Sequence, residues 1–138
     1  MEKEFVSYEI ALKLKELGFN QPCFGYYTGD KKHLQLRPNM GRINEPSDDV
    51  PTAPTFSQAF RWFREKYGLI GYIQTSYITH EVVNNRNIPC TPRIEFTFGI
   101  TNTIGKNIFS SFKQGSLKTY EEAELEGLKK LIEIFKQK

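Results

Sequence analysis

The chain has 138 residues with 38% hydrophobic residues, 14% aromatic residues and a formal net charge of +3. This length and composition exclude a disordered tail and predict one domain over residues 1–138 that needs no disulfide or metal, with Cys23 and Cys90 as reduced thiols. No apolar run reaches the length of a membrane span and the first residues lack a signal-peptide pattern, so we expect a cytoplasmic protein with no membrane contact.

Capping residues predict the first two helices. Ser7 precedes the amphipathic segment 8–17, and Gly18 follows it as a residue that accepts a positive φ. Thr55 and Gln58 have the Thr-x-x-Gln spacing of a capping box, which opens a helix that ends at Gly68.

The third predicted helix begins after Thr119, where Glu122 completes a Thr-x-x-Glu capping box. Glutamates precede lysines along this segment, as the helix dipole favours, so helix stability explains the charges. The apolar residues at helical spacing, which predict its buried face, are Leu128, Leu131, Ile132 and Phe135.

Between the last two helices the apolar period changes to two. Apolar and polar side chains alternate over residues 93–101, which predicts a half-buried strand. Residues 69–79 are rich in β-branched and aromatic side chains, and residues 107–113 follow a turn at Gly105, so both are expected to be strands. A weaker hairpin is predicted from residues 23–28 and 33–37, with its turn at Gly29 and Asp30.

Two long connections, residues 38–54 and 80–92, contain prolines that resist regular structure and are predicted to be loops. We expect a loop to contribute if there is a specific site. Together these elements predict an α+β fold: an antiparallel sheet of about three to five strands, covered on one face by about three helices.

No metal or catalytic motif is found. Cys23 and His33 have the same spacing as His80 and Cys90, but this interval is not that of a known zinc module, so we predict no metal and no cofactor. The sequence has no Gly-x-Ser-x-Gly, no His-Glu-x-x-His and no phosphate-binding glycine loop. A non-enzymatic protein is therefore favoured, and a small enzyme of unknown activity is a weaker alternative.

A nucleic-acid function is the main alternative. From Thr55 onward the order helix, three strands, helix resembles that of the double-stranded RNA-binding domain. That family presents lysines to phosphates at the start of its last helix, whereas here Lys118 is followed by Thr119, Tyr120, Glu121 and Glu122. Carboxylates at this place repel a phosphate backbone, so the resemblance is one of order without the binding motif.

Strand aromatics and loop cations offer a second kind of nucleic-acid surface. Aromatic rings stack on bases and cations hold phosphates. The aromatic candidates are Tyr26, Tyr27, Tyr72 and Tyr77, and the cationic candidates are Lys31, Lys32, Arg37, Arg86 and Arg93. Tyrosine is also a favoured strand residue and loop lysines are usually solvated, so this reading is not preferred.

Four segments together carry a resemblance to a group of uncharacterised short proteins of Bacteroidota genomes, prophages and phages. The segments are "SYEIALKLKELGF", "QPCFGYY", "AFRWFREKYGL" and "TYEEAELEGLKKLIEI". The resemblance implies a bacterial cell or a phage-infected host as the setting, and it supplies no catalytic or binding residues. We therefore expect a phage- or prophage-associated accessory protein that binds an unknown protein partner.

The helix after Thr55 contains the one residue that its apolar stripe does not explain. Phe56, Phe60, Phe63 and Tyr67 share a face at 100° per residue, whereas Trp62 lies about 130° away, towards Lys66. Trp62 either packs under the first helix or the 38–54 loop, or it is exposed and anchors an interface together with Lys66.

Overall fold

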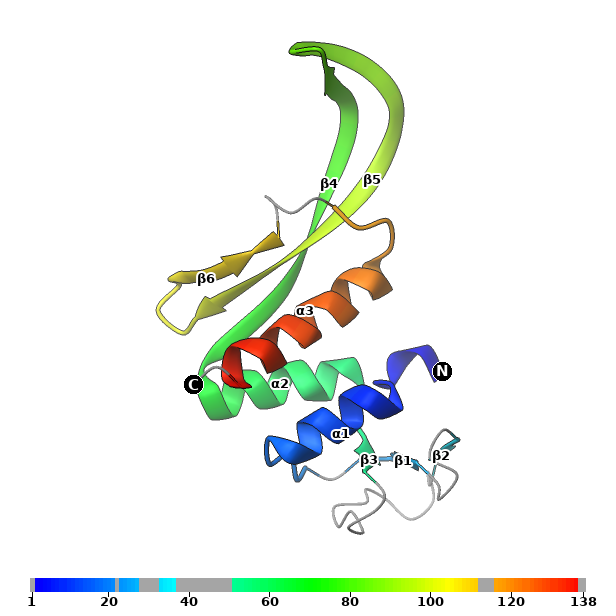
Figure 1. Cartoon of the computed structure of the whole chain (residues 1–138), viewed down its shortest axis with the longest axis vertical. Coiled ribbons are helices and arrows are strands. Elements are labelled where there is room, and N and C mark those ends of the chain that lie inside the picture. Colours follow the sequence, from blue (N-terminus) through cyan, green and yellow to red (C-terminus); the bar gives the residue numbers. More distant parts are fainter. Residues whose placement is uncertain (1, 22, 28–32, 37–50, 112–115, 137–138) are drawn as a thin grey trace.

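The computed structural model describes residues 2–21, 23–27, 33–36, 51–111 and 116–136. Within these ranges the predicted α+β fold class is confirmed, with three helices and two antiparallel sheets (Figure 1). The helices are α1 (Tyr8–Glu16), α2 (Phe56–Tyr67) and α3 (Tyr120–Lys136), after a short 3-10 helix, η1 (Glu2–Glu4). The strands are β1 (Gly25–Tyr27), β2 (Leu34–Leu36), β3 (Thr52–Ala53), β4 (Leu69–Val83), β5 (Arg86–Asn102) and β6 (Asn107–Ser110).

The capping residues begin and end the helices as predicted. The Ser7 side chain accepts from the Ile10 N–H, and the Thr55–Gln58 capping box is complete. Gly68 ends α2 with a φ of 65°. At the start of α3 the Thr119 hydroxyl accepts from the backbone N–H of Glu122.

The capping box predicted at α3 is shifted by one residue. The Glu122 carboxylate accepts from the backbone N–H of Lys118, at 3.3 Å, where the sequence pattern predicts the N–H of Thr119. The carboxylate still satisfies a free donor next to the first turn, so the shift preserves the stabilising effect of the cap.

The strands form two sheets instead of one. β1 lies between β2 and β3 in a small sheet, and β5 lies between β4 and β6 in a larger one. The predicted hairpin of β1 and β2 is confirmed, while its turn at Gly29 and Asp30 lies outside the described residues. The predicted 38–54 loop is wrong at its end, because β3 pairs with β1; residues 38–50 lie outside the described part.

The helices lie between the two sheets, as Figure 1 shows. α2 and α3 pack against β4, and α3 also packs against β5. α1 packs against α3 and β3, so only two of the three helices cover the larger sheet. The shared core includes Leu14 of α1, Phe63 of α2, Ile100 of β5 and Leu131 of α3, each fully buried.

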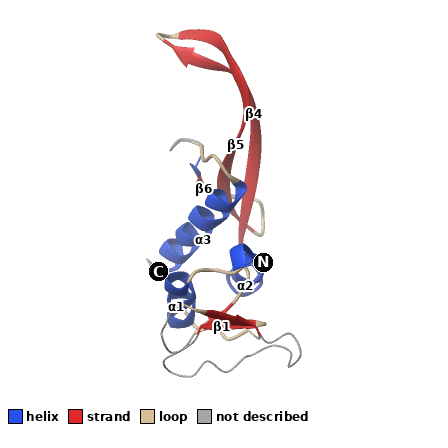
Figure 2. Cartoon of the chain, turned by 90° about the vertical axis from the view of Figure 1, so that its right-hand side faces the viewer, coloured by secondary structure: helices blue, strands red, loops and turns tan. Residues whose placement is uncertain are grey.

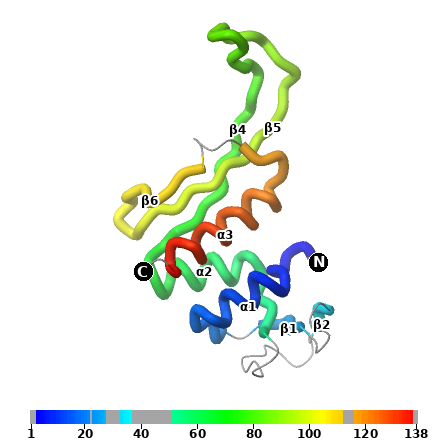
Figure 3. Tube along the Cα trace, in the orientation of Figure 1, coloured from blue at the N-terminus to red at the C-terminus, as the bar shows by residue number. Residues whose placement is uncertain are grey.

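The predicted 80–92 loop is wrong, because these residues extend β4 and β5 into one long hairpin. Its turn is formed by Asn84 and Asn85, with φ angles of 52° and 62°, the left-handed conformations that a tight two-residue hairpin turn requires. Figure 2 shows the hairpin as a thin ribbon beyond the helices, and the Cα trace shows its curvature (Figure 3). We call residues 76–95, from Ser76 to its cross-strand partner Glu95, the arm.

The arm accommodates its prolines at positions where the ladder does not need them. Ile78 pairs with Arg93 and His80 pairs with Pro89, so one residue of β4 lies opposite three of β5, including Pro92. A proline nitrogen has no hydrogen to donate, so proline is confined to bulges and to free edges of a sheet. The register shift therefore explains how a proline-containing segment forms a strand.

Candidate functional site

The arm is the candidate functional site because it combines exposure with apolar side chains. None of residues 76–95 is buried. Tyr77 is 68% exposed and Val82 is 73% exposed, and the other exposed apolar side chains are Val83, Ile88 and Ile94. Exposed apolar residues gathered in one place mark interaction surfaces more often than scattered ones do.

Both faces of the arm tip carry apolar side chains. Cross-strand partners share a face and neighbours along a strand alternate, so Val82 lies on one face. Val83 and Ile88 lie on the other face, in the neighbouring pairs Val83–Arg86 and Glu81–Ile88. Since an uncovered two-stranded hairpin is only marginally stable in water, the tip is suited to being covered by another molecule.

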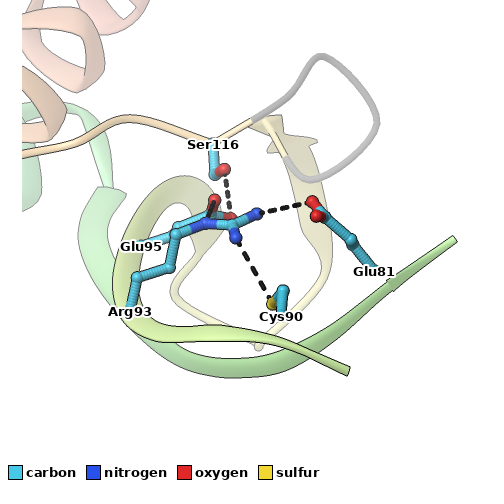
Figure 4. Close-up of polar contacts among 5 residues, drawn as sticks. All are labelled: Glu81, Cys90, Arg93, Glu95 and Ser116. Carbon is cyan, nitrogen blue, oxygen red and sulfur yellow. Dashed lines mark hydrogen bonds and ion pairs between the residues drawn. The ribbon is translucent and has the colours of Figure 1, made fainter. Parts of the chain in front are cut away.

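A polar cluster runs along the arm and reaches the segment before α3. The Arg93 guanidinium donates to Glu95 at 2.7 Å and lies 3.6 Å from the Glu81 carboxylate, as Figure 4 shows. It also lies 3.5 Å from the Cys90 sulfur. Glu95 in turn accepts from the Ser116 hydroxyl, which comes from the segment that leads into α3. The cluster therefore ties the arm to the body.

These contacts alter the acidity of the cluster. The Ser116 hydroxyl and then the Arg93 guanidinium lower the pKa of Glu95 below its usual value of 4.5. The hydrogen bond to Glu95 raises the pKa of Arg93. Both groups are therefore charged at neutral pH and offset one another.

The arm has no excess of positive charge. Between residues 76 and 95 the charged residues are Glu81, Glu95, Arg86 and Arg93, which gives a formal charge of zero with neutral His80. Arg93 is paired with both glutamates, and Arg86 lies beside the turn at the tip. Nucleic-acid binding draws most of its affinity from cations that neutralise phosphates, so the arm lacks that chemistry.

The outer edge of β4 is open. β4 is at one end of the larger sheet, and among the described residues its only backbone hydrogen bonds are those of its ladder with β5. Edge strands are normally protected by charges, prolines or bulges. Over Leu69–Val83 the one charged side chain is Glu81, and the prolines of the arm, Pro89 and Pro92, are on β5.

A pocket of about 350 Å³ lies against β4 where the strand leaves the body. It is lined by Phe60, Ile73 and Tyr120 together with polar residues of α2 and α3, among them Arg64 and Glu124. Burial, and then the neighbouring Glu121, raise the pKa of Glu124. The pocket has an aromatic wall and hydrogen-bonding groups, the combination that accepts an amphipathic ring.

The interface candidate Trp62 is buried. Its ring is 4% exposed and contacts Phe19, Phe63 and Tyr67 at centroid distances of 5.1–5.3 Å. Trp62 therefore packs in the core, where Phe19, which follows α1, contacts its ring. Lys66 is exposed, and its Nζ lies 5.2 Å from the centroid of the Trp62 ring.

Of the nucleic-acid candidates that the structure describes, Tyr77, Arg86 and Arg93 share the arm and Tyr27 and Tyr72 lie elsewhere. Tyr27 is buried and its hydroxyl donates to the Val6 carbonyl, while Tyr72 packs over Gly99. Tyr77 is on the arm with Arg86 and Arg93. Lys31, Lys32 and Arg37 lie outside the described residues.

Other chemistry is not assembled in the part of the chain that the structure describes. No group of three His, Cys, Asp or Glu side chains there could hold a metal ion, and Cys23 and Cys90 do not form a disulfide. No helix in these ranges is long and apolar enough to cross a bilayer.

Comparison with protein-family models, with curated proteins and with solved structures finds no match for this chain. The resemblance to the double-stranded RNA-binding domain therefore rests on element order alone, which α2, β4, β5, β6 and α3 follow.

Sequence reasoning missed the arm, although a signal was present. The Asn84-Asn85 pair is flanked by Val82 and Val83 on one side and by Ile88 on the other, which is a hairpin pattern. The two prolines of the segment led to the prediction of a loop instead, since proline argues against a strand. Pro89 falls at a position that the hairpin tolerates, but Pro92 fits only because of the register shift, which depends on the facing strand.

Proposed function

We propose that this chain is a non-enzymatic accessory protein that acts by binding another protein through the arm. The observation that carries the proposal is a hairpin of zero formal charge whose apolar side chains, Tyr77, Val82 and Ile88 among them, are exposed. The resemblance of four sequence segments to proteins of Bacteroidota, prophages and phages supports a phage or prophage setting.

Protein is a better partner than nucleic acid for this surface. Apolar and aromatic anchors contribute most of the binding energy at protein interfaces, whereas phosphate binding needs unpaired cations. The arm offers apolar and aromatic side chains, and its Arg93 is already paired with two glutamates. Glu121 and Glu122 at the start of α3 are also exposed, which disfavours a phosphate backbone there.

Site-specific photo-cross-linking tests the proposal. A photoreactive residue replaces Ile88 on the arm, and in a matched control it replaces Ile104, an exposed apolar residue in the turn before β6. Each chain is produced in a bacterial cell of the phage-host type, and the cross-linked peptides are identified by mass spectrometry. We expect a defined protein adduct from position 88 that position 104 does not give.

Two results would contradict the proposal. One is the same set of adducts from both positions, which indicates random collision. The other is a mobility shift of double-stranded DNA or RNA at low salt that is lost in an Arg86→Ala variant, because this would make the arm a nucleic-acid element.

A further inference from the structure

The backbone of β4 presents a defined set of hydrogen-bonding groups to solvent. Phe96 of β5 exchanges hydrogen bonds with Leu117, at 2.9 and 2.7 Å, on the side of β5 that faces away from β4. Its partner in β4, Thr75, therefore belongs to a non-hydrogen-bonded pair, and the N–H and C=O of Thr75 point to the outer edge. Hydrogen-bonded and non-hydrogen-bonded pairs alternate along the ladder, so the N–H and C=O groups of Ile73 and Tyr77 also point to the outer edge.

The side chains of these three residues lie on the face of the sheet that the helices cover. A Cβ atom added to Gly71 would be 2.7 Å from the Phe60 ring and 3.3 Å from Leu131, so this face of β4 looks towards α2 and α3. Ile73, Thr75 and Tyr77 share it because the ladder is regular from Leu69 to Ile78. Tyr77 lies two residues beyond Thr75, whose partner Phe96 pairs with Leu117 shortly before α3, and Tyr77 is exposed.

We propose that β4 pairs antiparallel with β4 of a second copy of this chain, about a two-fold axis at Thr75. The inference rests on the proposed function, since it names one protein that the hairpin binds. In this register Ile73 faces Tyr77 of the second copy and the reverse, which gives about six backbone hydrogen bonds and two aromatic–β-branched pairs. The larger sheets of the two copies, each with the order β4-β5-β6, then become one continuous sheet.

The absence of charge from this part of β4 favours a second copy as the partner, and the prolines of β5 favour the edge of β4 over that of β5. Residues 69–79 carry no charged side chain, so a two-fold axis at Thr75 brings no like charges together. The other free edge of the arm belongs to β5, where Pro89 and Pro92 lack the N–H that an added strand needs. The free edge of β4 can therefore accept another strand, and two copies of this edge can pair with each other without charge repulsion.

The pocket beside β4 supplies the anchor point. Ile73 lines it, so a tyrosine paired opposite Ile73 on the helix-covered face enters the space between Phe60 and Tyr120. Arg64 and Glu124 also line the pocket and can hydrogen-bond a phenolic hydroxyl. Tyr77 of the second copy has the exposure and the position for this role.

Hydrogen exchange on the unmodified chain is the direct test, combined with the molar mass by light scattering. We expect a dimer at micromolar concentration in which the amides of Ile73, Thr75 and Tyr77 exchange slowly. On dilution to monomer these three amides become fast, while those of Gln74 and Ser76, which point to β5, stay slow. A monomer at all concentrations, or a dimer whose three outward amides exchange fast, would overturn the inference.

Variants give an independent check. Thr75→Pro removes one outward N–H and leaves the β5 ladder intact, so we expect a folded monomer by circular dichroism; Thr75→Val keeps the donor and stays dimeric. Tyr77→Ala is expected to weaken the dimer about 30-fold and Ile104→Ala not at all. A Thr75→Pro or a Tyr77→Ala chain as dimeric as its control would contradict the pairing.

The two proposals fail differently. A monomeric chain that still forms specific adducts from position 88 removes the second copy as partner and leaves protein binding by the arm. A dimer that gives no such adducts and shifts nucleic acid keeps the β4 pairing and removes the proposed function.

Discussion

At the scale of single residues, Trp62 shows how a core position differs from an interface position. A helical projection places it outside the stripe formed by Phe60 and Phe63, because that projection assumes one buried face. In the structure α2 is covered on two sides: Phe60 meets Gly71 of β4, and Trp62 meets Phe19 after α1. The exposed-anchor reading of Trp62 therefore has no support from its burial.

Replacing Trp62 with alanine is expected to lower the free energy of unfolding by about 3 to 5 kcal/mol, because a large buried ring leaves a cavity. Chemical denaturation measures the loss. Glu65→Ala, on the exposed side of the same helix and outside the pocket beside β4, is the control and is expected to change stability by no more than about 0.5 kcal/mol. A similarly small loss for Trp62→Ala would contradict its place in the core.

Glu95 gives a pH-dependent prediction. Its folded pKa is lowered, so its contribution to stability is present above 4.5 and is lost as the pH falls through the lowered value. Ser116→Ala removes the largest cause of the shift, and we expect the carboxyl titration of Glu95, followed by NMR, to move up towards 4.5. An unchanged titration midpoint in the variant would show that Ser116 does not hold the arm through Glu95.

At the scale of elements, capping chemistry, period-two alternation and β-branched and aromatic content predicted α1, α2, α3 and the body strands other than β3. Ser7, Thr55 and Thr119 act within a few residues of themselves, so local sequence determines their effect. The division into two sheets depends on which strand lies beside β1, and that is a contact between distant segments. The register shift that lets Pro92 into the arm also depends on the facing strand.

Tyr72 and Gly99 form a second pairing that only the folded sheet reveals. A Cβ atom at Gly99 would overlap the Tyr72 ring, which crosses the glycine on the sheet face opposite the helices. Gly99→Ala is expected to destabilise the chain by about 1 to 3 kcal/mol in thermal or chemical unfolding.

The loss from Gly99→Ala should shrink when Tyr72 is also replaced with alanine, because the clash is then absent. An additive double-mutant cycle would mean that the ring and the glycine do not interact. Gly127→Ala is a useful comparison, since a Cβ atom there meets Phe98 at an ordinary contact distance of 3.5 Å.

At the scale of the whole molecule, the body and the arm have separate tasks. The body contains the buried core and holds the base of the arm through Ser116 and Glu95. The arm extends beyond the helices (Figure 1), and its apolar side chains Tyr77, Val82 and Ile88 are exposed. The site could not be found from the sequence because exposure, and not residue type, distinguishes Val82 and Ile88 from core residues.

Shortening the arm tests this division most directly. Residues 79–92 are replaced by an Asn-Gly turn between Ile78 and Arg93, which are cross-strand partners. The full and shortened chains are compared by thermal unfolding and by quantitative affinity capture from phage-infected host cells. We expect closely similar melting temperatures. We also expect the shortened chain to lose the captured protein unless that protein is a second copy of this chain, because the shortened chain retains residues 73–77. Capture of a different protein in the same amount by both chains would contradict the role of the arm.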